Sequence, residues 1–286
     1  MKIGILAGTN RADEFGRYGE NTYKKLKEFS FEAADYNISN TDSDIYNLPR
    51  EQSDAILLRE RKLAEEAGIE ISQVHGPWRY PPRDGTEEDR AERLEKMKIS
   101  IRAASVVGCK NWVVHPLMPF GTGDRGTPEA AITRQINLQF LRELLKTAKE
   151  CGVTVCLENM PMLNFSISTP EEILSIVNEI DDESLKICLD TGHVNVFKEL
   201  NIYDEVIRIG DKLKVLHVHD NVISRDIHLL PYFGTLDWKA FAKGLKDVGF
   251  NGSFSIETSP PAGLNDELFE KAARLTVDII KSIING

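Results

Sequence analysis

The sequence predicts a single α/β domain, residues 1–286, folded as a parallel (β/α)8 barrel. Short apolar segments alternate with amphipathic segments along the whole chain, and no Pro/Gly/Ser-rich linker or change of composition divides it. The length and the 41% of hydrophobic residues suit one large barrel with a substantial core. A doubly wound open sheet is the alternative, but the segment GILAGTNRAD lacks the G-x-G-x-x-G pattern of a dinucleotide-binding turn.

The strand candidates are short apolar runs. They lie at 2–8, 33–39, 69–76, 111–116, 153–159, 185–192, 214–220 and 253–258. The clearest helical patterns lie near 87–107 and 129–151. Thr127 and Thr169, each followed by Pro and Glu, are typical helix N-caps. The segments EAGIE and ECGVT each place a glycine where a helix should stop before the next strand.

Charge and cysteine content narrow the class of protein. A net charge of −10 and a pI near 5.2 argue against a general nucleic-acid or membrane surface. The four cysteines lie in apolar runs without a C-x-x-C pair, which is typical of buried reduced thiols in an intracellular protein. No segment approaches the roughly 18 apolar residues of a membrane span, and MKIGILA is too short for a signal-peptide core. We therefore expect a soluble, cytoplasmic protein.

Polar residues gather at the ends of the predicted strands. In (β/α)8 barrels, the residues that do chemistry lie at the carboxyl ends of the strands. All six histidines lie at or near this face, and three of them fall within HVHDNVISRDIH at 217–228. The candidates are His75, His115, Glu158, Asp190, His193, His219, Asp226, His228 and Glu257. Because successive strand residues point to opposite faces, the carboxylates that end strands five, six and eight should converge inside the barrel mouth.

This crowding predicts a metal site. Several carboxylates and imidazoles at one mouth are costly to desolvate and repel one another unless a cation neutralises them. Histidine and carboxylate ligands without thiolate suit Zn²⁺, Mn²⁺ or Co²⁺ better than Ca²⁺. On strand seven we expect His219 as the ligand. His217 comes two residues earlier and points to the same face of the strand as His219, one layer deeper in the barrel. It is interpreted equally well as a hydrogen-bonded interior residue. Asp220 either orients a ligand imidazole or is a loop residue.

The segments CLENMP, ICLDTGH, HVHDN…DIHLLP…GTLDW and SIET resemble the xylose-isomerase-like barrel superfamily. This superfamily includes sugar-phosphate isomerases and epimerases, ketose 3-epimerases, inosose dehydratases and endonuclease IV. The resemblance spans strands three to eight in order, and it implies a metal held by Glu158, Asp190, His219 and Glu257. In the ketose epimerases, the two glutamates also move protons on opposite faces of the substrate through a metal-stabilised enediolate. The resemblance therefore implies that Glu158 and Glu257 are the acid/base pair.

The same resemblance implies residues that contact a substrate. His193 and Arg225 match the substrate-contacting positions of the epimerases, and we also expect His75 and Trp78 to contact the substrate. The epimerases carry a further glutamate six residues after the strand-five glutamate, where this chain has Asn164. This difference affects the sugar specificity.

Endonuclease IV offers a different match. Its trinuclear zinc site uses nine side chains, and this chain has a residue of the same type at each of the nine candidate positions. The loop from His219 to Asp226 is shorter than in the nuclease, however, and its basic, DNA-penetrating loops are not evident. We therefore predict a sugar or sugar-phosphate isomerase or epimerase that depends on Zn²⁺, Mn²⁺ or Co²⁺. The alternatives are an endonuclease IV-like nuclease or phosphodiesterase and an inosose-dehydratase-like lyase. We expect a small-molecule partner, no membrane or nucleic-acid partner, and a chain compatible with homo-oligomers.

Overall fold

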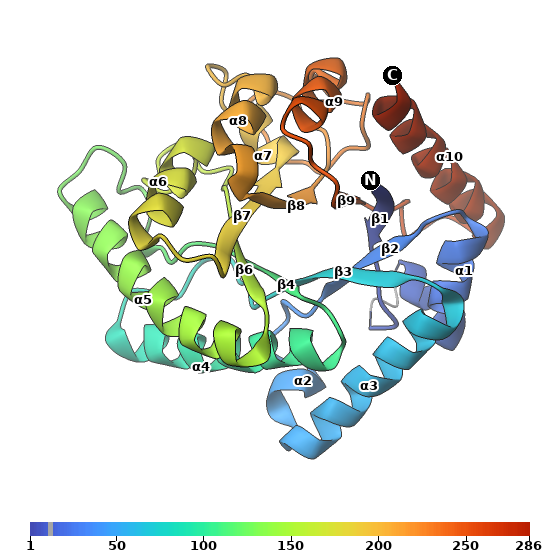
Figure 1. Cartoon of the computed structure of the whole chain (residues 1–286), viewed down its shortest axis with the longest axis horizontal. Coiled ribbons are helices and arrows are strands. Elements are labelled where there is room, and N and C mark those ends of the chain that lie inside the picture. Colours follow the sequence, from blue (N-terminus) through green and yellow to red (C-terminus); the bar gives the residue numbers. More distant parts are fainter. Residues whose placement is uncertain (11–13) are drawn as a thin grey trace.

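The computed structural model describes residues 1–10 and 14–286. Its centre is an eight-stranded sheet in the order β8-β7-β6-β4-β3-β2-β1-β9, surrounded by helices (Figure 1). The strands of this sheet are β1 (Lys2–Leu6), β2 (Ala33–Asn37), β3 (Glu70–His75), β4 (Asn111–Val114), β6 (Thr154–Glu158), β7 (Leu185–Asp190), β8 (Leu213–His217) and β9 (Ser253–Ile256). All paired strands are parallel and each predicted strand segment overlaps one of them, so the (β/α)8 barrel is confirmed. A short extra strand, β5 (Pro119–Thr122), follows β4.

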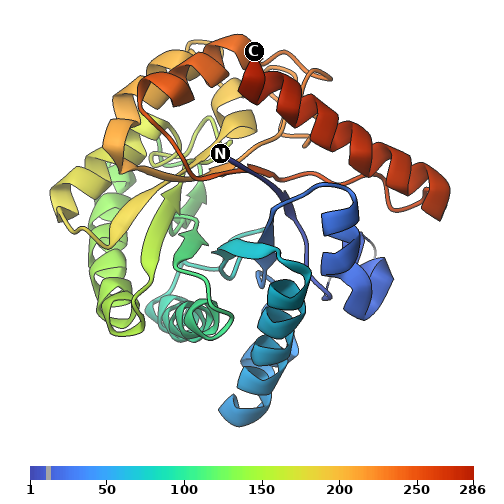
Figure 2. The ribbon, with the colours of Figure 1, turned by 45° about the vertical axis from the view of Figure 1, so that its right-hand side comes forward.

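The barrel closes between β8 and β9, just past the ends of these strands. Val218 donates its N–H to the carbonyl of Ser255 at 2.8 Å, and its own carbonyl accepts from the N–H of Glu257 at 2.9 Å. On the other side of β9 lies β1, so the first and last strands are side by side (Figure 2). This closure brings the histidines around Val218 next to Glu257, although they are far apart in the sequence.

Helices connect the strands around the outside of the barrel (Figure 1). The helices are η1 (Phe15–Asn21), α1 (Thr22–Glu28), α2 (Asp44–Asn47), α3 (Arg50–Ala67), α4 (Glu87–Val106), α5 (Glu129–Cys151), α6 (Pro170–Ile180), α7 (Thr191–Asn195), α8 (Ile202–Ile209), η2 (Gly210–Lys212), α9 (Trp238–Asp247) and α10 (Asp266–Asn285). The two clearest helix predictions are confirmed by α4 and α5. Within residues 1–10 and 14–286, no helix combines the length and the apolar character needed to cross a membrane.

Helix ends follow the signals in the sequence. The hydroxyl of Thr169 accepts the N–H of Glu172, and the Glu172 carboxylate accepts the N–H of Thr169, so a capping box begins α6. The predicted cap at Thr127 is wrong by one residue, because Pro128 is the N-cap of α5. Gly152 ends α5 with a φ of 65°, a left-handed conformation that glycine adopts without a steric cost.

A small apolar layer lies inside the barrel beneath its polar rim. This layer consists of Val113, Cys156, Cys188 and Val215. Two residues further along each segment come His115, Glu158, Asp190 and His217. Because alternate strand residues share a face, these polar side chains also point into the barrel, one layer higher. The intervening residues, such as Leu157 and Leu189, belong to the main core.

Candidate metal centre

The polar rim contains two groups of side chains with metal-ligating atoms. We call them the inner group (Glu158, Asp190, His217 and Glu257) and the outer group (His193, His219, Asp226 and His228). Within each group, the ligand atoms all lie within 4.8 Å of one another. His75 and His115 form a further set with Glu158 of the inner group. The structure therefore brings together all the residues expected at the rim, and it adds His217.

Glu158 lies at the centre of the inner group. It ends β6, and its Oε1 lies 2.9 Å from Nδ1 of His217. Its Oε2 lies 3.0 Å from Nε2 of His115 and 3.6 Å from Nε2 of His75. Nδ1 of His217 is also 3.5 Å from Oε2 of Glu257. Donor atoms from five separate segments therefore surround one small volume at the barrel mouth.

The imidazoles beside Glu158 place nitrogen atoms where they could bind a cation. Nε2 of His75 and Nε2 of His115 are 3.2 Å apart and lie near the same glutamate oxygen. Nδ1 of His75 donates to the carbonyl of Gly76 at 2.8 Å, which leaves Nε2 unprotonated when the ring is neutral. Two facing imidazole nitrogens beside a carboxylate are a donor set that suits Zn²⁺, Mn²⁺ or Co²⁺.

The two glutamates of the inner group have opposite pKa shifts. Burial acts to raise the pKa of Glu158, but the adjacent His217 and His115 lower it to well below its usual value. The pKa of Glu257 is raised, because burial and the nearby carboxylates of Glu158 and Asp190 outweigh the attraction of His217. One carboxylate is thus held ionised, and the other takes up a proton more readily. Two carboxyl groups whose pKa values are pushed apart are suited to acid/base chemistry.

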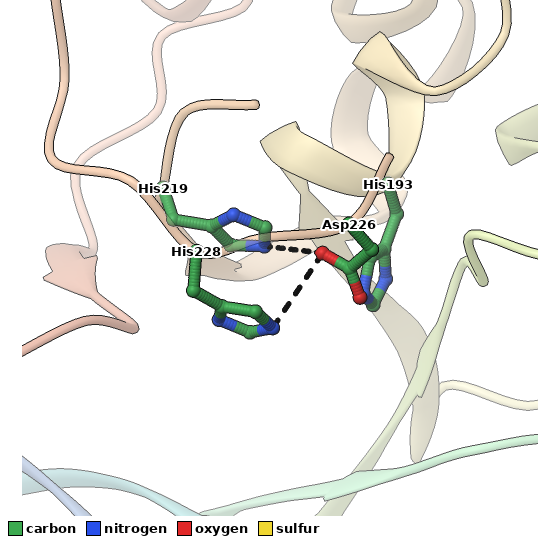
Figure 3. A group of neighbouring side chains, drawn as sticks. All are labelled: His193, His219, Asp226 and His228. Carbon is green, nitrogen blue, oxygen red and sulfur yellow. Dashed lines mark ion pairs between the residues drawn. The ribbon is translucent and has the colours of Figure 1, made fainter. Parts of the chain in front are cut away.

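The outer group surrounds Asp226 (Figure 3). Its carboxylate oxygens lie 3.4 Å from Nε2 of His193, 3.5 Å from Nε2 of His228 and 3.8 Å from Nε2 of His219. The rings of His219 and His228 are stacked, with their centroids 3.9 Å apart. Three imidazoles and one carboxylate thus face a common point near the surface of the mouth.

Backbone carbonyls orient the outer imidazoles. Nδ1 of His193 lies 2.7 Å from the carbonyl oxygen of Asn159, and Nδ1 of His228 lies 2.9 Å from that of Glu257. A proton on Nδ1 donates to these oxygens, so Nε2 faces Asp226. Burial acts to lower the pKa of His193 and of His228, but neighbouring carboxylates raise these pKa values to about 10 and about 9. Burial acts to raise the pKa of Asp226, but the two histidines lower it.

On strand β8, the residue that faces the two glutamates is His217. The arrangement of the side chains therefore favours His217 over His219, the residue expected from the sequence, beside the two glutamates. Nε2 of His219 lies 3.1 Å from the Asp190 carboxylate, but its ring belongs to the outer group. The reason is the layering of the barrel, because His217 ends the strand one layer above Val215, whereas His219 lies beyond the strand end.

The segment DTGH, residues 190–193, connects the two groups. Asp190 ends β7 and begins α7, where its side chain accepts the N–H of His193 at 2.7 Å. The Thr191 hydroxyl donates to the carbonyl of His219 at 2.8 Å and accepts its N–H at 3.1 Å. Gly192 leaves room for the His219 ring, since a Cβ there would lie 2.0 Å from Cε1. This short turn therefore fixes the relative positions of β7, α7 and the segment after β8.

The residues expected to contact a substrate lie at different depths. His75 and His193 are buried among the metal-ligating side chains of the rim, which we call the centre. Trp78 is half-buried, and its ring centroid lies 4.3 Å from that of His115. Arg225 is exposed in the loop that follows β8. The structure thus places three of these residues in or against the centre and the fourth in the loop beside it.

A cavity of about 410 Å³ opens beside the centre. Glu257 and His228 form one part of its lining, and Leu6, Asn37 and residues 258–262 form another. The side chain of Glu257 is 14% exposed and that of Glu158 is 1% exposed. A small ligand therefore has access to Glu257 from this cavity, and Glu158 lies deeper.

Three residues have roles at the rim that the sequence did not define. Asn159 donates to the carbonyl of Asp190 at 3.1 Å and accepts its N–H at 2.8 Å. Its place directly after Glu158 in CLENMP is a signal for this role. Asp220 is a loop residue, because its carboxylate accepts several N–H groups of the segment up to Trp238. Asp35 contacts a rim histidine from β2, and nothing near it in the sequence indicates this.

Known proteins share this architecture. The chain is 26% identical over 208 residues to a D-psicose 3-epimerase of Enterocloster bolteae, and the match covers 70% of this chain and 65% of that protein. The crystal structure of a D-tagatose 3-epimerase-like protein is 25% identical in sequence. Its match covers 100% of this chain and 97% of that chain, with a TM-score of 0.77. The fold is also shared with the crystal structure of the IOLI protein, which holds a zinc atom and is 18% identical. That match covers 99% of this chain and 98% of the other, with a TM-score of 0.76. Residues 24–277 match the family model of the xylose isomerase-like TIM barrel, and the chain therefore belongs to that family.

Proposed function

We propose that this protein is a divalent-metal-dependent isomerase or epimerase of a sugar or sugar phosphate. The observation that carries the proposal is the inner group, in which two glutamates with opposite pKa shifts lie together with Asp190 and His217. The family of the chain and its likeness to sugar epimerases support the same class of reaction.

The donor atoms of the inner group fit a divalent cation. The proposed ligands are Glu158, Asp190, His217 and Glu257. Carboxylate and imidazole donors suit Zn²⁺, Mn²⁺ or Co²⁺, and the zinc atom of the IOLI protein supports this choice. When bound, the ion supplies positive charge that polarises adjacent carbonyl and hydroxyl oxygens and makes the C–H bond between them more acidic.

Glu158 and Glu257 are the proposed acid/base pair. Glu257 borders the cavity, and its raised pKa suits a carboxyl group that takes up and returns a proton. Glu158 lies deeper and is held ionised beside His217 and His115, so it is able to accept a proton. In an epimerisation, one carboxylate removes a proton from one face of a carbon, and the other carboxyl group returns a proton to the opposite face. His193 and Arg225 are proposed to bind the oxygens of the substrate.

The outer group favours one alternative. Together with His75, His115 and the three carboxylates of the inner group, it supplies the nine residue types of an endonuclease IV-like trinuclear site. Such a site would make the protein a nuclease or phosphodiesterase. The net charge of −10 argues against a nucleic-acid substrate. An inosose-dehydratase-like lyase would use the same acid/base pair and release water. The number of bound metal ions and the reaction products distinguish these functions.

Proton exchange in D₂O tests the proposal. We expect metal-loaded protein to place deuterium on the carbon next to the carbonyl of one sugar in a panel of ketoses, aldoses and their phosphates. Glu158→Gln and Glu257→Gln keep the side-chain size but remove the base, so exchange should fall at least about 100-fold. The matched control is Glu143→Gln on the exposed face of α5, where the glutamate contacts only Lys146 among the described ion pairs. This control should keep full exchange.

Metal content is measured in the same samples, because both glutamates are proposed ligands. A Gln variant that keeps its metal and its full exchange rate would refute the acid/base assignment. Metal-loaded protein that exchanges no proton of any sugar in the panel, but cleaves abasic DNA, would refute the isomerase and favour the nuclease.

A further inference from the structure

We propose that Asp35 is a positioning residue that turns His217 toward the inner group. Its carboxylate accepts the Nε2–H of His217, and Nδ1 of the same ring is then available to a cation beside Glu158. The inference rests on the proposed function, because it takes the inner group to be a metal site.

Asp35 reaches His217 across the interior of the barrel. It lies on β2, is 1% exposed, and its Oδ2 lies 2.9 Å from Nε2 of His217. The same oxygen accepts a hydrogen bond from Nε2 of Gln73 at 2.9 Å. Gln73 also donates to the carbonyl of Leu216 at 3.1 Å, so the amide and the carboxylate are both held against β8. Since β2 and β8 are not neighbours in the sheet, this contact is not part of the strand pairing.

His217 is oriented differently from other histidines of the rim. Nδ1 faces a backbone carbonyl at 2.8 Å in His75, 2.7 Å in His193 and 2.9 Å in His228. In His217 the two nitrogens have exchanged roles, because Nδ1 lies 2.9 Å from Glu158 and Nε2 faces Asp35. A hydrogen bond to a carboxylate is stronger than one to a carbonyl, and it makes the other nitrogen of the ring a more basic ligand.

The charge of Asp35 has its counterpart at His217, because the two side chains form an ion pair when the ring carries a positive charge. In the part of the chain that the structure describes, its hydrogen bonds come from an amide and an imidazole, and its other oxygen, Oδ1, has no partner. Burying a carboxylate in this way is costly unless a positive charge compensates for it. A cation on Nδ1 of His217 would supply that charge through the ring.

Asp35→Asn tests the inference, because it keeps the size of the side chain and removes its charge. The dissociation constant for Zn²⁺ is measured by competition with a chromophoric chelator, and the melting temperature is measured on metal-free protein. We expect Zn²⁺ to bind the tightest site about 10- to 100-fold more weakly, with the metal-free variant still folded. The matched control is Glu60→Gln. Glu60 is also buried, at 2% exposure, but it accepts hydrogen bonds from Thr9 and Tyr23 outside both groups, so its variant should keep the wild-type affinity.

A second measurement is made on the wild-type protein, so it does not depend on how Asp35→Asn folds. Long-range ¹H–¹⁵N correlation spectra of the Zn²⁺-loaded protein show which ring nitrogen of each histidine carries the proton, and His217→Gln identifies the signals of His217. We expect the proton on Nε2 of His217 and on Nδ1 of His75. A proton on Nδ1 of His217, or an Asp35→Asn variant with unchanged Zn²⁺ affinity, would overturn the inference.

The inference and the proposed function fail in different ways. If Asp35→Asn weakens Zn²⁺ binding but no sugar exchanges a proton, the role of Asp35 stands and the proposed reaction is wrong. If metal-dependent exchange is found but Asp35→Asn binds Zn²⁺ as tightly as the wild type, the reaction stands and the role of Asp35 is wrong. A wild-type protein that binds none of Zn²⁺, Mn²⁺ and Co²⁺ overturns both.

Discussion

Gly192 lies directly against the imidazole of His219, so that a Cβ at position 192 would be 2.0 Å from Cε1 and 2.3 Å from Nδ1 of the ring. The ring is thereby held with its Nε2 3.1 Å from the Asp190 carboxylate and 3.8 Å from that of Asp226. The glycine of DTGH is therefore required by the close approach of a side chain, and not by an unusual backbone angle.

Gly192→Ala should displace His219 and weaken metal binding at the outer group. The tightest site should be kept, because the inner group does not contain His219. Overpacking of this kind costs about 1–3 kcal/mol of unfolding free energy. Elemental analysis and urea denaturation measure the two effects, and Gly123→Ala, where a Cβ meets open space, is the control. Unchanged metal content and stability in Gly192→Ala would show that the outer group does not need this packing.

The two histidines of strand β8 should have unequal effects on the tightest metal site. His217→Ala removes a proposed ligand of the inner group, whereas His219→Ala removes a member of the outer group. We expect the first variant to lose tight Zn²⁺ binding and the second to keep it, as measured by chelator competition. If His219→Ala loses tight binding and His217→Ala only lowers stability, the assignment of ligands to the two groups is wrong.

The sequence was sufficient to predict the barrel and its rim, but not the choice between these histidines. Eight apolar segments with polar ends define the strands, and parity places Glu158, Asp190 and Glu257 inside. His217 and His219 have the same parity, however, and only the register of β8 against β7 decides which one is level with Asp190. That register shifts at an irregularity between Ile187 and Cys188, which no local pattern reveals.

Asp35 illustrates a second limit of sequence patterns. It is a single carboxylate within an apolar strand, and its partner His217 is 182 residues away. Periodicity shows which face of a strand is buried, but it does not show which residues meet across the interior of a closed barrel. Arg225 could not be placed from the sequence for a similar reason, because the path of the loop after β8 depends on contacts with Asp220.

Metal binding at the outer group should release protons. The raised pKa values of His193 and His228, about 10 and about 9, keep both rings protonated at neutral pH in the metal-free protein. Because the pKa values are raised, the two protonated rings stabilise the metal-free fold. The stabilisation is complete at pH values below the pKa of an unfolded histidine, about 6.5, and it is lost as the pH rises through about 9 and about 10. A metal that binds both Nε2 atoms must displace about two protons, so its affinity should rise roughly 100-fold per pH unit near neutral pH.

Calorimetric titrations with Zn²⁺ in two buffers of different ionisation enthalpy measure the number of protons released. The matched control is His193→Gln, which should reduce the number by about one. An affinity that does not change across neutral pH, or a heat that is independent of the buffer, would contradict a metal site at the outer group.

Asp220 should be required for the fold of the loop that carries Asp226 and His228. Its carboxylate is fully buried. It accepts hydrogen bonds of 2.9–3.1 Å from the backbone N–H groups of Asn221, Tyr232 and Leu236 and from Nε1 of Trp238. Asp220→Ala leaves these donors without their acceptor, and each buried donor left unsatisfied costs about 1–3 kcal/mol. We therefore expect the free energy of unfolding to fall by at least about 3 kcal/mol.

The same Asp220→Ala variant should become sensitive to limited proteolysis within residues 221–236 and should bind less metal at the outer group, because the loop supplies two of its four members. Asp237→Ala is the matched control, because Asp237 comes directly after this loop and is the N-cap of α9. Its side chain accepts one hydrogen bond, from the N–H of Ala240 at 3.0 Å. Loss of this cap should cost only about 1 kcal/mol and should leave the metal content unchanged. If the two alanine variants are equally stable and equally resistant to protease, the Asp220 carboxylate does not organise the loop, and the outer group must be held in place by the contacts of His219 with Thr191 and Gly192.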